Sequence, residues 1–389
     1  MRGRLNTLSA LIVLILIIGF PRFYGTEVPM AIILIPFFFL GFIRTFLRLG
    51  VFSLIFLSLF FFGFVLGVVS YFFGEGHLGD IFFHLVIYLK ILLVFFFAYV
   101  VSQVIYGRLN VLLYWIVFQI FVVLLAFINA QFYDFLLGFI SPRSAEIFKH
   151  LFGLRSLGFG LFHMEGSITL VFAVFLYVLL SGVDRQYLAV FLALLSFPFA
   201  MAVARSAIVP FSVFAFFSKG IVVKASVVLA FLLMFLIAQI VESGAMYEAV
   251  EIFRNIISGQ GAYSESVAHL PSMYSLPDNL STYLIGDGKY YSGYAENLSF
   301  YMNSDVGYIR ILYFSGLFSL LIFIALNVFF NFIAFAKLRG QIFYGYRSYF
   351  LVSLVVFLII NAKGVQVAPF FGLVLFYYAF KVRSDSNRC

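Results

Sequence analysis

The chain has 389 residues and a formal net charge of +8, yet charged residues make up 10% of it and apolar residues 64%. A soluble domain needs a largely polar surface, which so few charges cannot supply, so this composition excludes an ordinary soluble enzyme. The apolar residues gather in blocks of roughly 16 to 25 residues, each long enough to cross the hydrocarbon core as a helix. The sequence therefore predicts an all-α polytopic bundle that forms a single integral membrane domain over residues 1–389.

Twelve apolar runs are candidate membrane spans. They lie at 5–20, 27–42, 51–73, 81–105, 109–129, 166–182, 186–204, 206–218, 221–241, 306–336, 347–362 and 364–380. The run at 206–218 is the weakest, because it is short and contains Pro210, and a re-entrant segment is the alternative there. If all twelve runs cross the bilayer, both termini lie on the same side.

The charges between the runs assign the two sides of the membrane. Every loop on the side of the termini is basic, which predicts that this side and both termini are cytoplasmic. Its cations are Arg44, Arg48, Arg108, Arg185, Lys219, Lys224, Lys337, Arg339, Arg347, Lys381, Arg383 and Arg388. The opposite side carries a mid-chain loop at 130–165 and a large loop at 242–305. The basic charge of the chain is thus a topology signal and calls for no nucleic-acid partner.

The large outer loop, 242–305, is acidic and rich in tyrosine. Its eight carboxylates outnumber its two cations, Arg254 and Lys289. Residues 243–257 place apolar side chains at helical spacing, which predicts an amphipathic helix that lies either at the membrane interface or against the bundle. The tyrosines that follow suit either stacking on sugar rings or an aromatic belt at membrane level.

Arginines and carboxylates gather where the outer loops meet the membrane. Arg310 lies about 7.5 Å beyond Asp305 along a span, where an arginine has to be paired or line a polar cavity. Snorkelling back to the interface is the alternative for Arg310. Arg205 occupies an outer hairpin turn, where positive charge is disfavoured. The whole boundary set is Arg155, His163, Glu165, Arg205, Asp305 and Arg310. Guanidinium groups at one boundary predict a site for a phosphate-bearing lipid head group, because their fork matches phosphate oxygens.

Two charged residues have competing explanations. Asp305 precedes a span closely enough to cap its first turn, so a structural role competes with a chemical one. Lys90 lies deep in the fourth run, where it either pairs with a phosphate or carboxylate or remains a structural charge. The histidines show no ligand spacing, the single cysteine is Cys389, and no phosphate-binding loop occurs. We therefore expect no metal, no cofactor and no direct use of ATP.

Short motifs surround several of these residues. They are Arg155-x-x-Gly158 before a span, Ala204-Arg205-Ser206-Ala207 after a hairpin, and Ile285-Gly286-Asp287-Gly288 followed by Ser304-Asp305-Val306-Gly307-Tyr308. Together with the loop layout, they resemble the O-antigen polymerases (Wzy type) over residues 130–336. The related O-antigen ligases typically carry a His-Asn pair in the large loop. Here His269 is followed by Leu270, which favours a polymerase over a ligase.

The resemblance implies a metal-independent glycosyltransferase of the bacterial inner membrane, multi-pass, that joins undecaprenyl-pyrophosphate-linked repeat units at the periplasmic face. A hydroxyl of one unit would attack the anomeric carbon of the growing chain, and undecaprenyl pyrophosphate would leave. Arg205 and Arg310 would hold the pyrophosphate and Arg155 the second lipid, while Asp305 leads as the base, ahead of Glu165, His163 and Asp287. The expected catalytic residues are Arg155, Arg205, Asp305 and Arg310, and the expected substrate-binding residues are His163, Glu165, Asp287, Lys289 and Tyr308.

The expected partners are undecaprenyl-pyrophosphate-linked glycans and membrane lipids, with a chain-length regulator and a flippase as further candidates. Three other functions compete: a flippase of lipid-linked oligosaccharide, an O-antigen ligase, and a scaffold that binds glycan without catalysis. Charged residues concentrated at one boundary, beside a loop of about sixty residues, favour chemistry at a fixed site over passage through the membrane.

Overall fold

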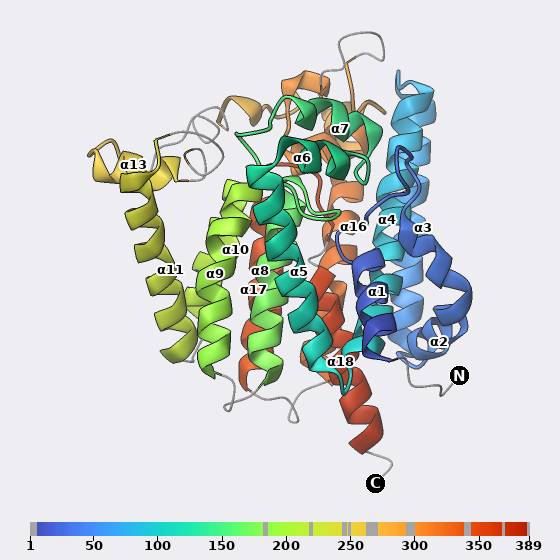
Figure 1. Ribbon diagram of the computed structural model, residues 1–389. Coiled ribbons are helices and arrows are strands. Elements are labelled where there is room, and N and C mark those ends of the chain that lie inside the picture. Colours follow the sequence, from blue (N-terminus) through green and yellow to red (C-terminus); the bar gives the residue numbers. More distant parts are fainter. Residues whose placement is uncertain are drawn as a thin grey trace.

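The computed structural model describes residues 6–181, 186–217, 221–242, 247, 250–261, 271–292, 300–337, 344–367 and 370–386. Within these residues every regular element is helical, and the β contacts are two isolated bridges. The predicted all-α class is confirmed for this part of the chain. The long helices pack side by side as a bundle, and the short helices α6 (Ala130–Leu137), α7 (Pro142–Lys149) and α13 (Glu251–Ile257) lie across one end (Figure 1).

Seven helical segments are long and apolar enough to cross a membrane. They are Met30–Leu47, formed by η1 (Met30–Leu34) and α2 (Ile35–Leu47), then α3 (Val51–Phe73), α4 (Leu78–Ile105), α5 (Leu109–Ile128), α8 (His163–Ser181), α11 (Ile221–Ile240) and α16 (Gly307–Lys337), the last over Gly307–Ala334. All seven coincide with predicted runs, so the chain has the helices of a polytopic membrane protein.

The other five predicted runs form shorter helices among the described residues. They are α1 (Thr7–Ile17), α9 (Gln186–Val203), α10 (Ile208–Phe217) after the 3-10 turn η3 (Arg205–Ala207), α17 (Tyr344–Ile360) and α18 (Phe370–Ser386). At 1.5 Å per residue α1 is about 16 Å long, roughly half of the hydrocarbon core. Length and composition support seven crossings, and the count of twelve stays a prediction.

The two ends of the bundle differ. The start of α1 and the end of α18 lie at one end, and α6, α7 and α13 lie at the other (Figure 1). The segments predicted as outer loops, 130–165 and 242–305, therefore contribute their described helices to the same end. We refer to this end as the loop end.

The amphipathic helix predicted at 243–257 is described from residue 250 onward, apart from Tyr247, and residues 243–246 and 248–249 lie outside the described part. The described portion forms α13. Phe253 on this helix is buried, and its ring packs edge to face on Phe235 of α11, with centroids 5.1 Å apart. This face of α13 packs on the bundle, which favours the predicted placement against the bundle over the placement at the membrane interface.

A backbone break in α16 holds the large outer segment against the membrane helices. Gly316 interrupts the helix with φ of +74°, and the Phe314 carbonyl accepts a hydrogen bond from the Gly288 amide at 3.0 Å. A Cβ at Gly316 would lie 2.1 Å from the carbonyl oxygen of Leu284, the last residue of α15 (Leu280–Leu284). A side chain is therefore excluded twice, by the left-handed conformation and by the close approach of backbone.

Candidate functional site

Arg155 begins a loop that is fastened to two helices of the bundle. The Ser156 amide donates a hydrogen bond to the Ala202 carbonyl of α9 at 2.9 Å, and its hydroxyl donates to the Val123 carbonyl of α5 at 2.7 Å. Ala202 lies three residues before Arg205 in the sequence. The Ser156 hydrogen bonds therefore fix the backbone of Arg155 beside the turn that carries Arg205.

Gly158 explains the second half of the Arg155-x-x-Gly158 motif. The Gln119 side chain accepts a hydrogen bond from the Phe159 amide at 3.0 Å and donates one to the Phe159 carbonyl at 3.2 Å. A Cβ at Gly158 would lie 2.7 Å from Gln119 Oε1. The glycine lets the loop approach α5 closely, so this half of the motif has a packing role.

Arg205 lies in the η3 turn between α9 and α10. Its neighbour Ser206 shares a hydrogen bond with Ser167 of α8, with the two hydroxyl oxygens 3.1 Å apart. The Arg205 guanidinium forms an ion pair with Glu251, the first residue of α13, and both side chains are less than one-fifth exposed. The large outer segment thus supplies a carboxylate to this arginine.

A lysine absent from the predicted set, Lys363, belongs to the same region. It lies in the turn between α17 and α18, which packs on the start of α16, because a Cβ at Gly307 would lie 2.4 Å from the Gly364 carbonyl oxygen. The Tyr308 amide also donates to the Asn361 carbonyl, at 3.4 Å. These contacts place Lys363 next to Asp305.

The electrostatics of Lys363 join the separate segments into one cluster. Its crowded surroundings desolvate the ammonium and lower its pKa, and the charges of Arg205 and Arg155 lower the pKa further, while Asp305 raises it. The charges of Arg155 and Lys363 also act on His163. We call Arg155, Arg205, Lys363 and Asp305 the cationic cluster. Lys363 is its centre, because two further cations and one carboxylate act on this lysine, and Glu251 pairs with Arg205.

Arg310 is buried among aromatic side chains. Its side chain is 6% exposed, and its guanidinium carbon lies 3.9 Å from the ring centroid of Phe300 and 5.3 Å from that of Phe83. One guanidinium nitrogen lies 3.9 Å from Asp305 Oδ1. An arginine in this position is suited to orienting Asp305, whereas the predicted direct grip on pyrophosphate would require it to leave its aromatic surroundings.

Asp305 is subject to opposing influences. Burial raises the pKa of its carboxyl, and the charges of Arg310 and Lys363 lower it. The neighbouring Ser304 hydroxyl accepts a hydrogen bond from the Val306 amide at 3.3 Å, in the turn that precedes α16. The Asp305 side chain is 41% exposed, which leaves it accessible as a proton acceptor in the cluster.

Replacing Arg310 with glutamine is expected to shift the pH dependence of activity. Removing the positive charge leaves burial to raise the pKa of Asp305 further, so a base that works as the carboxylate loses activity at a higher pH than in the wild type. The acid limb of the pH–rate profile of glycan lengthening measures this shift. Arg143→Gln, on α7, is the matched control and should leave the limb in place. An unmoved limb in Arg310→Gln would remove Asp305 as the base.

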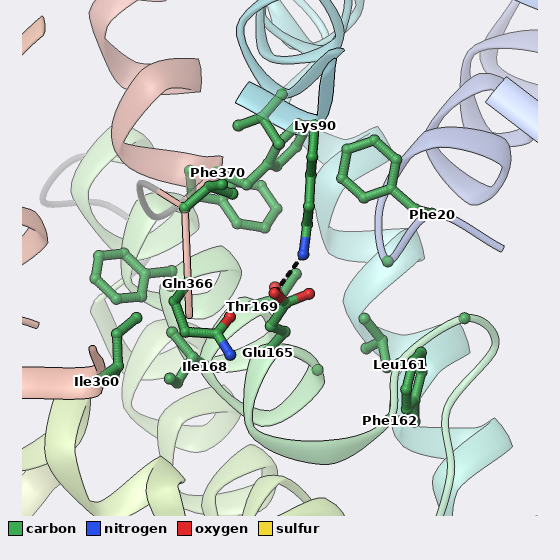
Figure 2. A pocket seen from close by; sticks show the side chains of 17 residues that line it. Phe20, Lys90, Leu161, Phe162, Glu165, Ile168, Thr169, Ile360, Gln366 and Phe370 are labelled. Carbon is green, nitrogen blue, oxygen red and sulfur yellow. Dashed lines mark hydrogen bonds and ion pairs between the residues drawn. The ribbon is translucent and has the colours of Figure 1, made fainter. Parts of the chain in front are cut away.

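Lys90 and Glu165 form a second charged feature, and this pair decides between the two explanations of Lys90. The ammonium of Lys90 on α4 lies 2.5 Å from Oε1 of Glu165 in the first turn of α8. The pair lies in a cavity of about 80 Å³, whose wall includes Phe20, Phe370 and Gln366 (Figure 2). Glu165 also acts electrostatically on His163, which faces the charges of Arg155 and Lys363, so the cavity adjoins the cationic cluster.

Strained backbone borders both features. Among the described residues, the non-glycine positions with positive φ are Phe20, His163, Met302 and Asn303, with values of 51° to 54°. Phe20 lines the cavity, His163 precedes Glu165, and Met302 and Asn303 precede Asp305 by two or three residues. The left-handed conformation is unfavourable above all for Phe20 and Met302, since histidine and asparagine adopt it more readily. Strained backbone of this kind concentrates at functional sites, which supports this region as the site.

Three predicted substrate-binding residues make contacts of a structural kind. Asp287 accepts hydrogen bonds from the hydroxyls of Thr282 at 2.7 Å and Tyr301 at 3.1 Å. Lys289 pairs with Glu75 at 2.8 Å. The Tyr308 hydroxyl donates to the Leu358 carbonyl at 2.6 Å. These bonds hold the outer segment and α17 in place, while Arg155, His163, Glu165, Arg205, Asp305 and Lys363 form the linked set.

A signal for Lys363 was present in the sequence. Like Arg205, it lies in a predicted outer hairpin turn, where positive charge is disfavoured. Applying the Arg205 argument to every outer turn would have selected it.

In the described part of the chain, no group of three or more His, Cys, Asp and Glu side chains is arranged to hold a metal ion. Comparison of the chain with protein-family models, curated proteins and solved structures gives no match, so function has to be argued from this geometry.

Proposed function

We propose that this chain is a membrane glycosyltransferase that polymerises oligosaccharide repeat units carried on undecaprenyl pyrophosphate, at the periplasmic face of the bacterial inner membrane. The observation that carries the proposal is the convergence of Arg155, Arg205 and Asp305 on Lys363, from four segments distant in sequence. Three cations in one place suit a diphosphate, which has more negative charge than a single cation can balance.

The proposal includes a topology of twelve crossings with both termini in the cytoplasm. Its support is the basic charge of the predicted inner loops and the placement of the start of α1 and the end of α18 at one end of the bundle (Figure 1). With that topology the loop end faces the periplasm, and the cationic cluster lies at the outer boundary of the membrane.

The reaction follows from the groups in the cluster. An acceptor hydroxyl of one lipid-linked unit attacks the anomeric carbon of the growing glycan, and the bond from that carbon to the pyrophosphate oxygen breaks. The leaving pyrophosphate keeps the bonding electron pair, and Arg155, Arg205 and Lys363 stabilise the charge that it gains. Asp305 takes the proton of the hydroxyl, with Arg310 holding the carboxylate in position. Because a diphosphate is already a stable anion, the step does not depend on a general acid.

Glu251 has a defined part in this scheme. Its carboxylate pairs with the Arg205 guanidinium, as a phosphate oxygen would. A bound pyrophosphate therefore competes with Glu251 for Arg205. Because Glu251 belongs to α13, this helix has to move when the pyrophosphate binds. The ion pair with Glu251 also holds the Arg205 guanidinium in one orientation.

The decisive experiment is an assay of the purified protein in vesicles with lipid-linked repeat units. Longer glycans are the expected product. Movement of the lipid across the vesicle without lengthening would instead show a flippase, transfer of glycan to a lipid A acceptor would show a ligase, and binding without either would show a scaffold. Any of these three outcomes overturns the proposal.

Lys363→Ala tests whether the added cation takes part. We expect a rate of lengthening about tenfold lower, because one charge-assisted contact to phosphate is lost at a partly solvated position. Lys363→Arg should recover most of the rate. Lys149→Ala, which removes an exposed lysine at the same end of the bundle, is the matched control and should behave like the wild type. Equal rates for Lys363→Ala and Lys149→Ala would exclude Lys363 from the site.

A further inference from the structure

The cavity between α4 and α8 has the chemistry of a binding site for a small polar ring. Its volume is about 80 Å³, and a site for one water needs roughly 10–15 Å³. The cavity is therefore several times larger than a site for one water, which gives room for a small organic group.

The walls combine two aromatic rings with a few polar groups. Phe20 and Phe370 meet edge to face with centroids 6.0 Å apart, and the Lys90 side chain reaches Glu165 from beside these rings (Figure 2). Thr169 and Gln366 add a hydroxyl and an amide to the lining. Apolar walls with a small number of placed polar groups are typical of small-molecule sites.

A hydrocarbon chain is a poor occupant of this cavity. It would cover the Lys90–Glu165 pair and the Gln366 amide without offering a hydrogen bond, and desolvated polar groups without partners are costly. A sugar offers hydroxyls to the carboxylate and amide, and its C–H faces can pack on the phenylalanine rings. The lining therefore favours a sugar over a lipid tail.

The cavity also lies where a sugar next to a pyrophosphate would be. The chain segment 155–166 contributes Arg155 to the cationic cluster and Leu161, Phe162 and Glu165 to the cavity. The turn 361–367 contributes Lys363 to the cluster and Gln366 to the cavity. Because each of these two segments contributes residues to both the cationic cluster and the cavity, the cavity lies next to the cluster.

We propose that this cavity is a subsite for one sugar ring of the lipid-linked glycan, with Glu165 and Gln366 as hydroxyl ligands and Phe20 and Phe370 as packing surfaces. This inference rests on the proposed function, because the pyrophosphate is what brings the glycan to the cluster. Glu165 acts here as a ligand that positions the ring, and Lys90 holds the carboxylate toward the cavity.

Binding to a matched set of lipids tests the subsite with the full-length protein. The probes are one polyprenyl pyrophosphate without sugar and the same lipid carrying a single glucose, galactose or N-acetylglucosamine. We expect at least one glycosylated lipid to bind the wild type about tenfold more tightly than the bare lipid, as expected for hydrogen bonds to a charged group. Equal affinity for all four probes would overturn the subsite.

Variants of the residues that line the cavity test whether the extra affinity for the glycosylated lipid arises there. Gln366→Leu should abolish the extra affinity and leave that for the bare lipid unchanged. The double change Lys90→Met with Glu165→Leu, which leaves no lone charge, should also abolish the extra affinity. Glu146→Gln, a carboxylate change on α7 outside this cavity, should keep the extra affinity. If both cavity variants keep it, the sugar binds elsewhere and the inference fails. A wild type that binds none of the probes, the bare lipid included, would contradict the proposed function itself.

Thiol labelling gives a measurement that does not depend on removing the ion pair. The chain has one cysteine, so Thr169→Cys in a Cys389→Ser background carries a single thiol in the cavity wall. A small methanethiosulfonate reagent should label it, and the tighter-binding glycosylated lipid should protect it while the bare lipid does not. Equal protection by both would show a hydrocarbon occupant, and protection by neither would place the sugar elsewhere. Either result overturns the inference.

Discussion

Arg205→Ala is expected to lower the rate of glycan lengthening by about a hundredfold to a thousandfold while membrane insertion is unchanged. Loss of one preorganised donor to a developing oxyanion has a cost of this order. The effect is increased because the negative charge of Glu251, which pairs with Arg205 in the structure, would no longer be balanced by this arginine beside the pyrophosphate. Glycan ladders from cells, together with rates from the purified protein, measure the loss.

The ion pair supplies an internal check on this prediction. Adding Glu251→Gln to Arg205→Ala removes the carboxylate that repels the pyrophosphate and should restore part of the lost rate, whereas Glu251→Gln alone removes the competitor for the guanidinium. Arg143→Ala, an exposed arginine on α7, is the control for loss of an outer arginine. Full ladders in Arg205→Ala would remove the cationic cluster as the reacting site.

Gly316→Ala is expected to destabilise the protein by about 3–5 kcal/mol, or to prevent its folding. The methyl group would lie 2.1 Å from the Leu284 carbonyl oxygen, and the turn that follows Leu284 is held to α16 by the hydrogen bond from the Gly288 amide to the Phe314 carbonyl. Relief would require the turn that contains Gly286 and Gly288 to leave the break in α16. Thermal unfolding of the purified protein in detergent measures the loss.

Gly259→Ala separates the two causes of the stability loss in Gly316→Ala, which are the left-handed backbone and the close contact with Leu284. Gly259 has φ of +78°, close to that of Gly316, but a Cβ there meets nothing within 4 Å. It should lose about 1 kcal/mol through the left-handed backbone alone. A similar loss of stability in the two variants would mean that the contact between Gly316 and Leu284 contributes nothing.

The sequence predicted the helices well because span formation is a local property. Each run is apolar over enough residues to satisfy its own backbone hydrogen bonds, so α3, for example, occupies the predicted 51–73. The shorter elements were harder to predict from the sequence, because the 11 residues of α1 and the 3-10 turn before α10 depend on packing with neighbouring helices. Local hydropathy carries no information on that packing.

The candidate site was predicted in part. Arg155, Arg205 and Asp305 were selected because charges at a membrane boundary are costly, and the structure links all three through Lys363. Asp287 was selected from its motif, but its carboxylate is held by Thr282 and Tyr301. A motif reports that a residue type matters at a position and does not distinguish a turn from a ligand.

The sequence by itself determined the membrane class of the protein and the segments that form its long helices, because hydropathy and length act within each segment. The tertiary structure decided which charges meet. Arg205 pairs with Glu251 and Lys90 pairs with Glu165 through contacts between elements that are 46 and 75 residues apart in the sequence. Those pairings depend on how the helices pack, which is a property of the whole bundle and not of any one segment.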